Sequence, residues 1–394
     1  MSNLPSMKRI YSIDFTRGLV MIIMALDHVR DLIHVDSVTQ SPTNLSTTTP
    51  ILFFTRWITH LCAPTFVFLA GTSAYMSWKN SGDISGTRKF LLKRGLWLIL
   101  LDFSVVNLGL FFDLGFHNLI FEVLSAIGFG FIILSFLLSA SVRTIGSIGL
   151  AILFLHDLLP LIPFSEGSVV RAVLSPLFNP GAFPMGKQTV FIMGYPPIPW
   201  LGILLTGFAA GKFFELPDQE RKRIFGKLGL GILVFFIVLR FINIYGDPAP
   251  WSVQKTPVYT FLSFMNVTKY PPSLLFCSAT LGVMFWMLAF GEQVRNRFTA
   301  FASVYGKAPL FYFVIHFYMI HLTLIVLLFF QGFHWTDLSF SSGNFGRPKG
   351  AESGLSLGAI YIIWACVVLV LYQPCRWFGR YKAQHKHVWW LKYI

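Results

Sequence analysis

Long hydrophobic runs separated by short polar segments dominate the chain. Ten of them approach the roughly 20 consecutive apolar residues that a helix needs to cross a bilayer. They are continuously apolar, whereas the strands of a membrane β-barrel alternate between lipid and lumen faces. We therefore predict an all-α, polytopic membrane bundle of about ten transmembrane helices. The predicted spans are residues 15–33, 51–78, 90–113, 119–138, 144–162, 198–214, 225–245, 273–290, 308–330 and 355–372.

Composition agrees with this pattern. The chain is 55% hydrophobic and 12% charged, so lipid must be the solvent for much of its surface. We expect one membrane domain over residues 1–394, with no cleavable signal peptide, because the basic start leads directly into a long span. Four longer connections are expected to cover a cavity or to order on a ligand: residues 34–50, 163–197, 246–272 and 331–354.

The positive charges indicate a topology. With the N-terminus inside, the inner segments hold 21 Lys and Arg residues and the outer loops hold 6. This asymmetry follows the positive-inside rule and places both termini in the cytoplasm. The net charge of +14 does not indicate nucleic-acid binding, because each basic cluster adjoins a span and suits anionic lipid.

The first span carries ionisable residues, which are costly at bilayer depth and therefore face partners or a hydrated cavity. Arg17 and His28 are eleven residues apart, so they share one helical face about 16 Å apart along the axis. Asp14 lies three residues before Arg17 and could pair with it. Asp31 lies one turn beyond His28 and could orient its ring. This stripe is the strongest candidate for chemistry in the chain.

The second span adds a cation and an imidazole. Arg56 and His60 are four residues apart and share a face. Pro64 should weaken the helix near residues 59–60, because it lacks the N–H that the carbonyl of residue 60 would accept. Since a short loop joins the first two spans, we expect His28 and His60 to line one pocket.

The remaining polar positions have a simpler interpretation. Asp27 and Arg30 form another three-residue pair on the first span, and Tyr312 precedes His316 by one turn in the ninth. A single intramembrane histidine is more often a hydrogen-bonded structural residue than a catalyst. That interpretation is favoured for His156, His316 and His321, and the set is completed by Asp102, Glu122, Asp157 and Arg240.

Two motifs are better explained by chance or by packing. Residues 181–187 spell the start of a phosphate-binding loop, but Gln188 replaces the metal-binding Ser or Thr. Gly207 and Gly211 have the spacing that lets helices approach closely. The four cysteines contain no C-x-x-C pair, so we expect neither disulfides nor a metal site.

The first span resembles two related families of membrane acyltransferases. Its Arg17-x10-His28 spacing, with Asp14 before it, is similar to acyltransferase family 3, which O-acylates bacterial surface glycans. Over nearly the whole chain the closer likeness is to bacterial members of the heparan-alpha-glucosaminide N-acetyltransferase catalytic-domain family. The matching segments are residues 12–19, 57–71, 195–202, 269–274 and 306–316.

The resemblance implies transfer of an acyl group, acetyl by preference, from cytoplasmic acyl-CoA to a hydroxyl or amine of a carbohydrate or envelope glycan. It also implies a bacterial inner-membrane location; a homodimer stays open. His28 would be the general base or the acyl carrier, and Arg56 and His60 would stabilise the oxyanion. The catalytic candidates are His28, Asp31, His60 and Arg56, and the donor-binding candidates are Asp14, Arg17, Lys307, Tyr312 and His316.

The resemblance does not carry over the active histidine of the lysosomal heparan enzyme. That histidine lies after the first span in a Trp-Asn-Gly setting that residues 34–50 lack. In the same register, His28 stands where that enzyme has Asn and His60 where it has an acidic residue. The catalytic assignment therefore rests on the family 3 spacing. Two other functions stay open: a transporter or flippase for a small polar solute or lipid-linked sugar, and a non-catalytic envelope scaffold.

Overall fold

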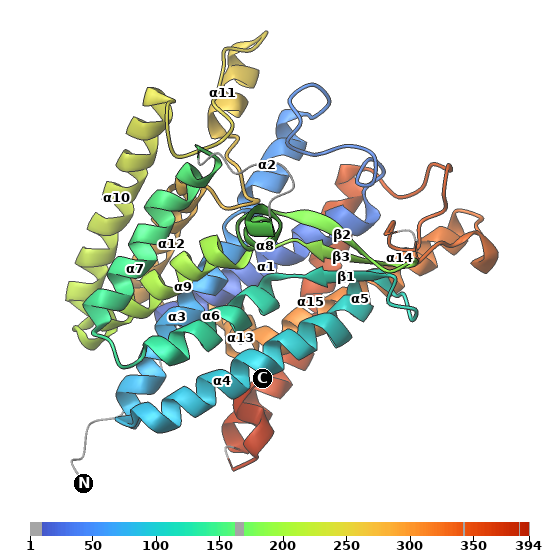
Figure 1. The fold of residues 1–394 in the computed structure, drawn as a ribbon. Coiled ribbons are helices and arrows are strands. Elements are labelled where there is room, and N and C mark those ends of the chain that lie inside the picture. The colour runs from blue at the N-terminus through green and yellow to red at the C-terminus, as the bar shows by residue number, and fades with distance from the viewer. Residues whose placement is uncertain (1–9, 162–168, 342, 386, 394) are drawn as a thin grey trace.

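The structure, a computed structural model, describes residues 10–161, 169–341, 343–385 and 387–393. The end of the predicted fifth span, Ile162, lies outside the described residues, as do Lys8, Arg9 and Lys386. The chain is 71% helical with little strand, which confirms the predicted fold class (Figure 1). The helices are α1 (Tyr11–Ile33), α2 (Pro50–Thr59), α3 (Cys62–Ser81), α4 (Ile84–Leu101), α5 (Asn107–Phe111), α6 (Val123–Leu137), α7 (Val142–Leu155), α8 (Val169–Phe178), α9 (Pro197–Ala210), α10 (Asp218–Ile242), α11 (Pro257–Met265), α12 (Leu274–Gln293), α13 (Arg297–Lys307), α14 (Pro309–Phe330) and α15 (Leu357–Gln384).

Eight helical segments in the described chain are long and apolar enough to cross a membrane. The other two predicted spans correspond to α1 and α6. The α1 helix has 23 residues but includes several charged side chains, and α6 has only 15 residues. The segments that meet the criteria are Pro50–Ser81, Ile84–Phe111, Val142–Leu159, Pro197–Glu215, Asp218–Ile242, Leu274–Gln293, Pro309–Phe330 and Leu357–Gln384.

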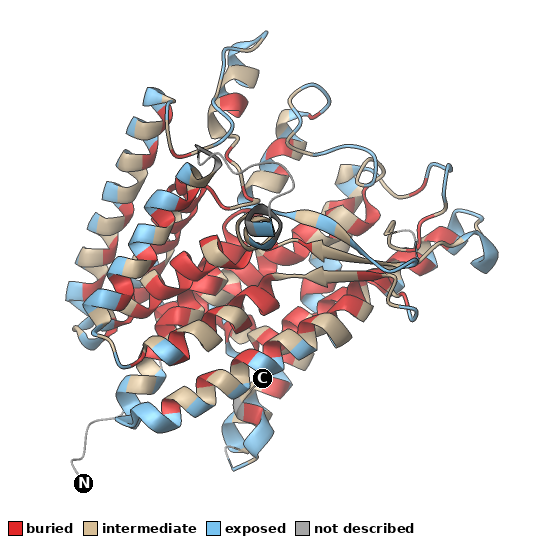
Figure 2. Cartoon of the chain, in the orientation of Figure 1, coloured by how far each residue is buried: buried red, intermediate tan, exposed pale blue. Residues whose placement is uncertain are grey.

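The charged helix α1 is enclosed by other helices. At Gly18 an added Cβ would lie 1.8 Å from the Ala302 carbonyl oxygen of α13, and at Gly306 it would lie 1.8 Å from the Asp14 carbonyl oxygen. Only glycine permits this backbone contact. Figure 2 shows the buried residues gathered at the centre of the bundle. The ionisable residues of α1 therefore face other parts of the protein.

The second predicted span is broken where the sequence indicated. Helix α2 ends at Thr59, and α3 begins at Cys62. The His60 N–H instead donates to the Trp57 carbonyl in a tighter turn. Because Pro64 cannot donate to the residue-60 carbonyl, the helix loses a hydrogen bond at this point. The prediction from Pro64 is confirmed.

A small sheet, which the sequence did not predict, includes the start of the predicted span 119–138: residues 119–121 form a strand, and the helix begins only at Val123. Its strands are β1 (Asn118–Phe121), β2 (Gly181–Met185) and β3 (Thr189–Met193), in the order β1-β3-β2. The strand β3 pairs parallel with β1 and antiparallel with β2. Residues 181–187 thus form a strand and turn rather than a loop that opens a helix, which confirms that the phosphate-loop match is due to chance.

Small residues bring α9 against α3. At Gly207 an added Cβ would lie 2.1 Å from the Phe68 carbonyl oxygen, and at Gly211 it would lie 2.5 Å from the Tyr75 side chain. The packing role that was predicted for this glycine pair is confirmed.

Candidate active site

A cavity of about 610 Å³ opens among α1, α3, α4, α6, α14 and α15, near the basic ends of these helices. We call it the basic-end cavity. Apolar side chains form much of its wall, and among the described residues that line it there is no Asp, Glu or His. Arg17 also donates to Ser73 Oγ at 3.0 Å, which holds the guanidinium at the wall. The cations that line the cavity are Arg17, Arg94, Lys307 and Lys382.

A second cavity of about 340 Å³ lies farther along α1. We call it the His28 cavity. Charges of both signs line it, unlike the basic-end cavity, and aromatic rings form part of its wall. Its ionisable and aromatic residues are Asp27, His28, Asp31, Arg56, Glu122, Tyr195, Lys269, Tyr270, Phe66, Phe111, Phe313, Phe317 and Phe345.

The two cavities are adjacent. Phe66, Val123 and Phe313 line both of them and therefore form the wall between them. These three residues come from α3, α6 and α14. We call them the shared wall. An extended chain could reach from one cavity into the other only by passing these side chains.

One stripe of α1 runs along both cavities. Arg17 and Met21 line the basic-end cavity, and Met24 and His28 line the His28 cavity. Their spacing of four, three and four residues keeps them on one helical face, with a rise of about 16 Å from first to last. The predicted shared face of Arg17 and His28 is therefore turned to cavities inside the protein.

A second histidine holds His28. The Nδ1 of His28 lies 2.6 Å from Nε2 of His316, and Nδ1 of His316 lies 3.0 Å from the Tyr312 carbonyl oxygen. A carbonyl only accepts, so neutral His316 carries its proton on Nδ1 and must accept at Nε2. His28 then donates from Nδ1 and keeps a lone pair on Nε2. Within the described residues that nitrogen has no hydrogen-bond partner, so it is available to act as a base.

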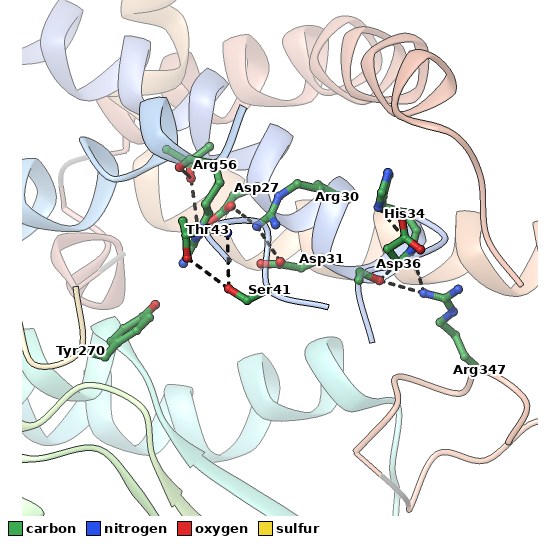
Figure 3. A network of polar contacts seen from close by, with 12 residues as sticks. Asp27, Arg30, Asp31, His34, Asp36, Ser41, Thr43, Arg56, Tyr270 and Arg347 are labelled. Atoms are coloured by element: carbon green, nitrogen blue, oxygen red, sulfur yellow. Dashed lines mark hydrogen bonds and ion pairs between the residues drawn. The ribbon is translucent and has the colours of Figure 1, made fainter. Parts of the chain in front are cut away.

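Asp27 is the centre of an ion-pair network beside His28 (Figure 3). Arg30 donates to Asp27 Oδ1 at 2.6 Å, as the three-residue spacing predicted, and Arg56 donates to Asp27 Oδ2. Arg30 also donates to Asp31 Oδ1 at 2.7 Å. The expectation that Asp31 orients His28 is therefore corrected: Asp31 pairs with Arg30, and His316 holds the imidazole.

The expected pocket shared by His28 and His60 is also corrected. His60 is buried beside Phe276 and is not among the residues that line the His28 cavity. Its Nδ1 has no hydrogen-bond partner in the described part of the chain. The break between α2 and α3 turns this side chain into the bundle, whereas Arg56, one turn earlier, lines the cavity. Only the arginine of this pair is placed to meet a substrate.

The donor-binding candidates divide in the same way. Arg17 and Lys307 line the basic-end cavity. Asp14 is buried near its wall, at the contact between α1 and α13, but does not line it. Tyr312 is fully buried, with no partner for its hydroxyl, and lines neither large cavity. His316 contacts His28 rather than the basic-end cavity.

The other intramembrane polar residues bind the protein itself. His156 lies 3.0 Å from the Pro272 carbonyl, and His321 lies 3.0 Å from the Leu110 carbonyl. Asp102 accepts from two backbone N–H groups at the start of α6, and Arg240 donates to four carbonyls. These contacts agree with the structural interpretation of such residues.

The sequence analysis missed two residues of the His28 cavity. Lys269 lay in a segment that resembled the family but was given no role, and Glu122 was noted only as an intramembrane acid. In the structure Glu122 precedes α6, in the connection from β1. Burial, with a further contribution from the Asp102 carboxylate, raises the pKa of Glu122 to about 7. Only the fold shows that both residues line this cavity.

The family comparison agrees with this geometry. The sequence model described as "Heparan-alpha-glucosaminide N-acetyltransferase, catalytic" matches residues 9–243. The chain belongs to this family. No curated protein matches the chain. The heparan-alpha-glucosaminide N-acetyltransferase family is in general one of membrane acetyltransferases, and its members use donors of the acetyl-CoA kind.

The family match covers part of the site only. The matched range includes α1 and α2, and so the Arg17–His28 stripe and Arg56. His316, Lys269 and Lys307 lie beyond it. In the described part of the chain, no group of three or more His, Cys, Asp or Glu side chains could hold a metal ion. The chemistry derived below uses only side chains of this chain and its substrates.

Proposed function

We propose that this protein transfers an acyl group, preferably acetyl, from acyl-CoA to a hydroxyl or amine of a carbohydrate or envelope-glycan acceptor. One observation carries the proposal: a guanidinium and an imidazole on the same stripe of α1 line two cavities that have a common wall. The donor would enter the basic-end cavity and the acceptor the His28 cavity. Transfer of the acyl group from the donor to the acceptor would take place beside the shared wall.

The basic-end cavity suits the nucleotide end of acyl-CoA. Arginine and lysine bind phosphate through charge-assisted hydrogen bonds, and four such cations line this cavity in the described part of the chain. Under this proposal, this end would face the cytoplasm of a bacterial cell at the inner membrane, where acyl-CoA would be available; the positive-inside pattern of the sequence supports this orientation. From Arg17 an extended pantetheine arm could cover the rise of about 16 Å to His28.

In the chemical step, His28 would act as general base. Its Nε2 takes the proton from the acceptor hydroxyl or amine as the acceptor oxygen or nitrogen attacks the thioester carbonyl. The new C–O or C–N bond forms, the C–S bond breaks, and the proton passes from His28 to the departing CoA thiolate. His316 stabilises the imidazolium through its Nε2, and Arg56 is the candidate for stabilising the oxyanion.

Substitution of His28 tests the chemical step. His28→Ala should lower acetyl-CoA-dependent acceptor modification by roughly 10²- to 10⁴-fold, the range expected for loss of a general base. The protein should still show the thermal stabilisation by acetyl-CoA that wild-type protein shows, because Arg17 and its cavity are intact. At 100 times the dissociation constant that stabilisation is about 2.7 kcal/mol. Full activity in His28→Ala would remove His28 from the mechanism.

The transporter alternative predicts a different result in the same preparation. Proteoliposomes would then show solute flux without acyl-CoA turnover, and acetyl-CoA at millimolar concentration would not stabilise the purified protein. Solute flux without acyl-CoA turnover, or a lack of stabilisation by acetyl-CoA, would favour a transporter if His28→Ala also leaves the flux unimpaired.

A further inference from the structure

Lys269 is a buried cation in the wall of the His28 cavity. Its residue is 8% exposed, and its Nζ lies 4.9 Å from the centre of the Tyr270 ring and 5.9 Å from that of Tyr195. The two hydroxyls of these tyrosines are 3.4 Å apart, so the rings form one continuous face beside the ammonium. All three residues line the cavity.

The other cations of this cavity already have carboxylate partners. Arg56 pairs with Asp27, and Arg30, beside the cavity, pairs with both Asp27 and Asp31. Among the described residues, by contrast, no carboxylate lies within ion-pair distance of Lys269, although Glu122 and Asp27 are near enough to feel its charge; its Nζ lies against the two tyrosine rings. Aromatic rings stabilise a cation only in part. A buried ammonium of this kind is stabilised fully only by an anion.

Glu122 is the remaining carboxylate of the cavity, but it does not fill this role. It forms no ion pair within the described residues, and burial raises its pKa to about 7, so near neutral pH a large fraction of it is uncharged. Lys269 therefore remains available to a ligand. The missing negative charge must come from a molecule that enters the cavity.

We infer that the acceptor carries a carboxylate or a phosphate, and that this anion binds Lys269 while the sugar ring packs against Tyr195 and Tyr270. This inference rests on the proposed function and extends it to the class of acceptor. The anion belongs to the acceptor rather than to the donor, because the phosphates of acyl-CoA have their own cations on the other side of the shared wall. Lys269 is thus a specificity-determining residue.

Calorimetric titration of the detergent-purified full chain with three sugars tests the inference. Glucose is neutral, glucuronic acid carries a carboxylate and glucose 6-phosphate carries a phosphate. Wild-type protein should bind at least one charged sugar on the order of thirtyfold more tightly than glucose, and the tighter of the two identifies the anion. Lys269→Gln should abolish this preference, and Lys269→Arg should retain most of it.

Lys255→Gln is the matched control, because Lys255 is an exposed lysine of the same outer connection and lines neither large cavity. The inference is wrong if wild-type protein binds the three sugars equally or binds no charged sugar at millimolar concentration. It is also wrong if Lys269→Gln keeps the preference. The titration contains no acetyl-CoA, so its result does not depend on acyl transfer. If wild-type protein prefers a charged sugar but shows no acyl transfer, only the proposed function is overturned.

Discussion

The two cavities beside α1 are adjacent but differ in the charges that line them. Of the residues that the structure describes, four cations and no acid line the basic-end cavity, whereas three carboxylates, a histidine and two cations line the His28 cavity. A uniform positive wall favours any polyanion of the right size. A mixed wall of paired charges selects by the arrangement of its few unpaired groups. Under the proposed function, this difference suits the basic-end cavity to donor binding and the His28 cavity to acceptor choice and chemistry.

After the loss of His28 itself, the largest effect is expected from the loss of its partner His316. His316→Leu removes the acceptor for His28 Nδ1–H and should lower kcat by on the order of 100-fold, with an unchanged KM for acetyl-CoA. His316→Gln can offer an amide oxygen near the position of Nε2 and should recover part of that loss. Steady-state kinetics of both variants at several pH values provides the measurement.

A purely structural role for His316 would give another pattern. Both variants would then lose thermal stability, and Gln would not restore kcat relative to Leu. His321→Leu serves as control, because His321 is also buried on α14 but bonds the Leu110 carbonyl and lines neither large cavity itself.

Residue spacing along the sequence predicted the local geometry of α1 and the break between α2 and α3. The shared face of Arg17 and His28 follows from eleven residues at 3.6 per turn, and the helix break near His60 follows from Pro64. The partner of His28 did not follow, because His316 is 288 residues away and no local spacing encodes that contact. Asp31 has the spacing to contact His28, but it pairs with Arg30, its neighbour in the sequence.

Two further features depended on tertiary structure. The strands of the small sheet have only four or five residues each, too few for a clear periodic signal, and β1 continues without a break into the hydrophobic run of α6. The position of Lys269 beside Tyr195 and Tyr270 depends on how two connections, residues 163–197 and 246–272, fold over the cavity. Continuous hydrophobic runs in the sequence identify helical spans, whereas no local pattern identifies a binding site that is assembled from loops.

A smaller effect is expected from the basic-end cavity, because four cations share its task. Arg17→Gln should raise the KM for acetyl-CoA on the order of tenfold while kcat changes little. Acetylpantetheine lacks the nucleotide phosphates, so wild-type protein and the variant should use it equally. Arg143→Gln, at an exposed arginine of α7 that lines neither large cavity, is the control. A kcat defect without a KM change would contradict the assignment of this cavity to donor binding.

The shared wall should limit the length of the acyl group. Phe66→Ala and Phe313→Ala widen the passage between the cavities. The ratio of kcat/KM for butyryl-CoA to that for acetyl-CoA should rise about fivefold in each, since added methylenes gain an apolar space. Competition between the two donors measures the ratio. Phe261→Ala, at an exposed phenylalanine of α11, should leave it unchanged, and an unchanged ratio in the wall variants would place the acyl group elsewhere.

The smallest expected effect concerns Glu122, whose pKa is raised to about 7. A raised carboxyl pKa means that Glu122 is mostly protonated at pH 6 and mostly ionised at pH 8. Its ionisation places a competing anion in the cavity of Lys269, so glucuronic acid, which is itself charged throughout this range, should bind about threefold more weakly at pH 8 than at pH 6. In Glu122→Gln the affinity should be the same at both values. If the affinity of Glu122→Gln still changed with pH, the change would have to come from another group. Glu122 would then not be the source of the pH response of the acceptor cavity.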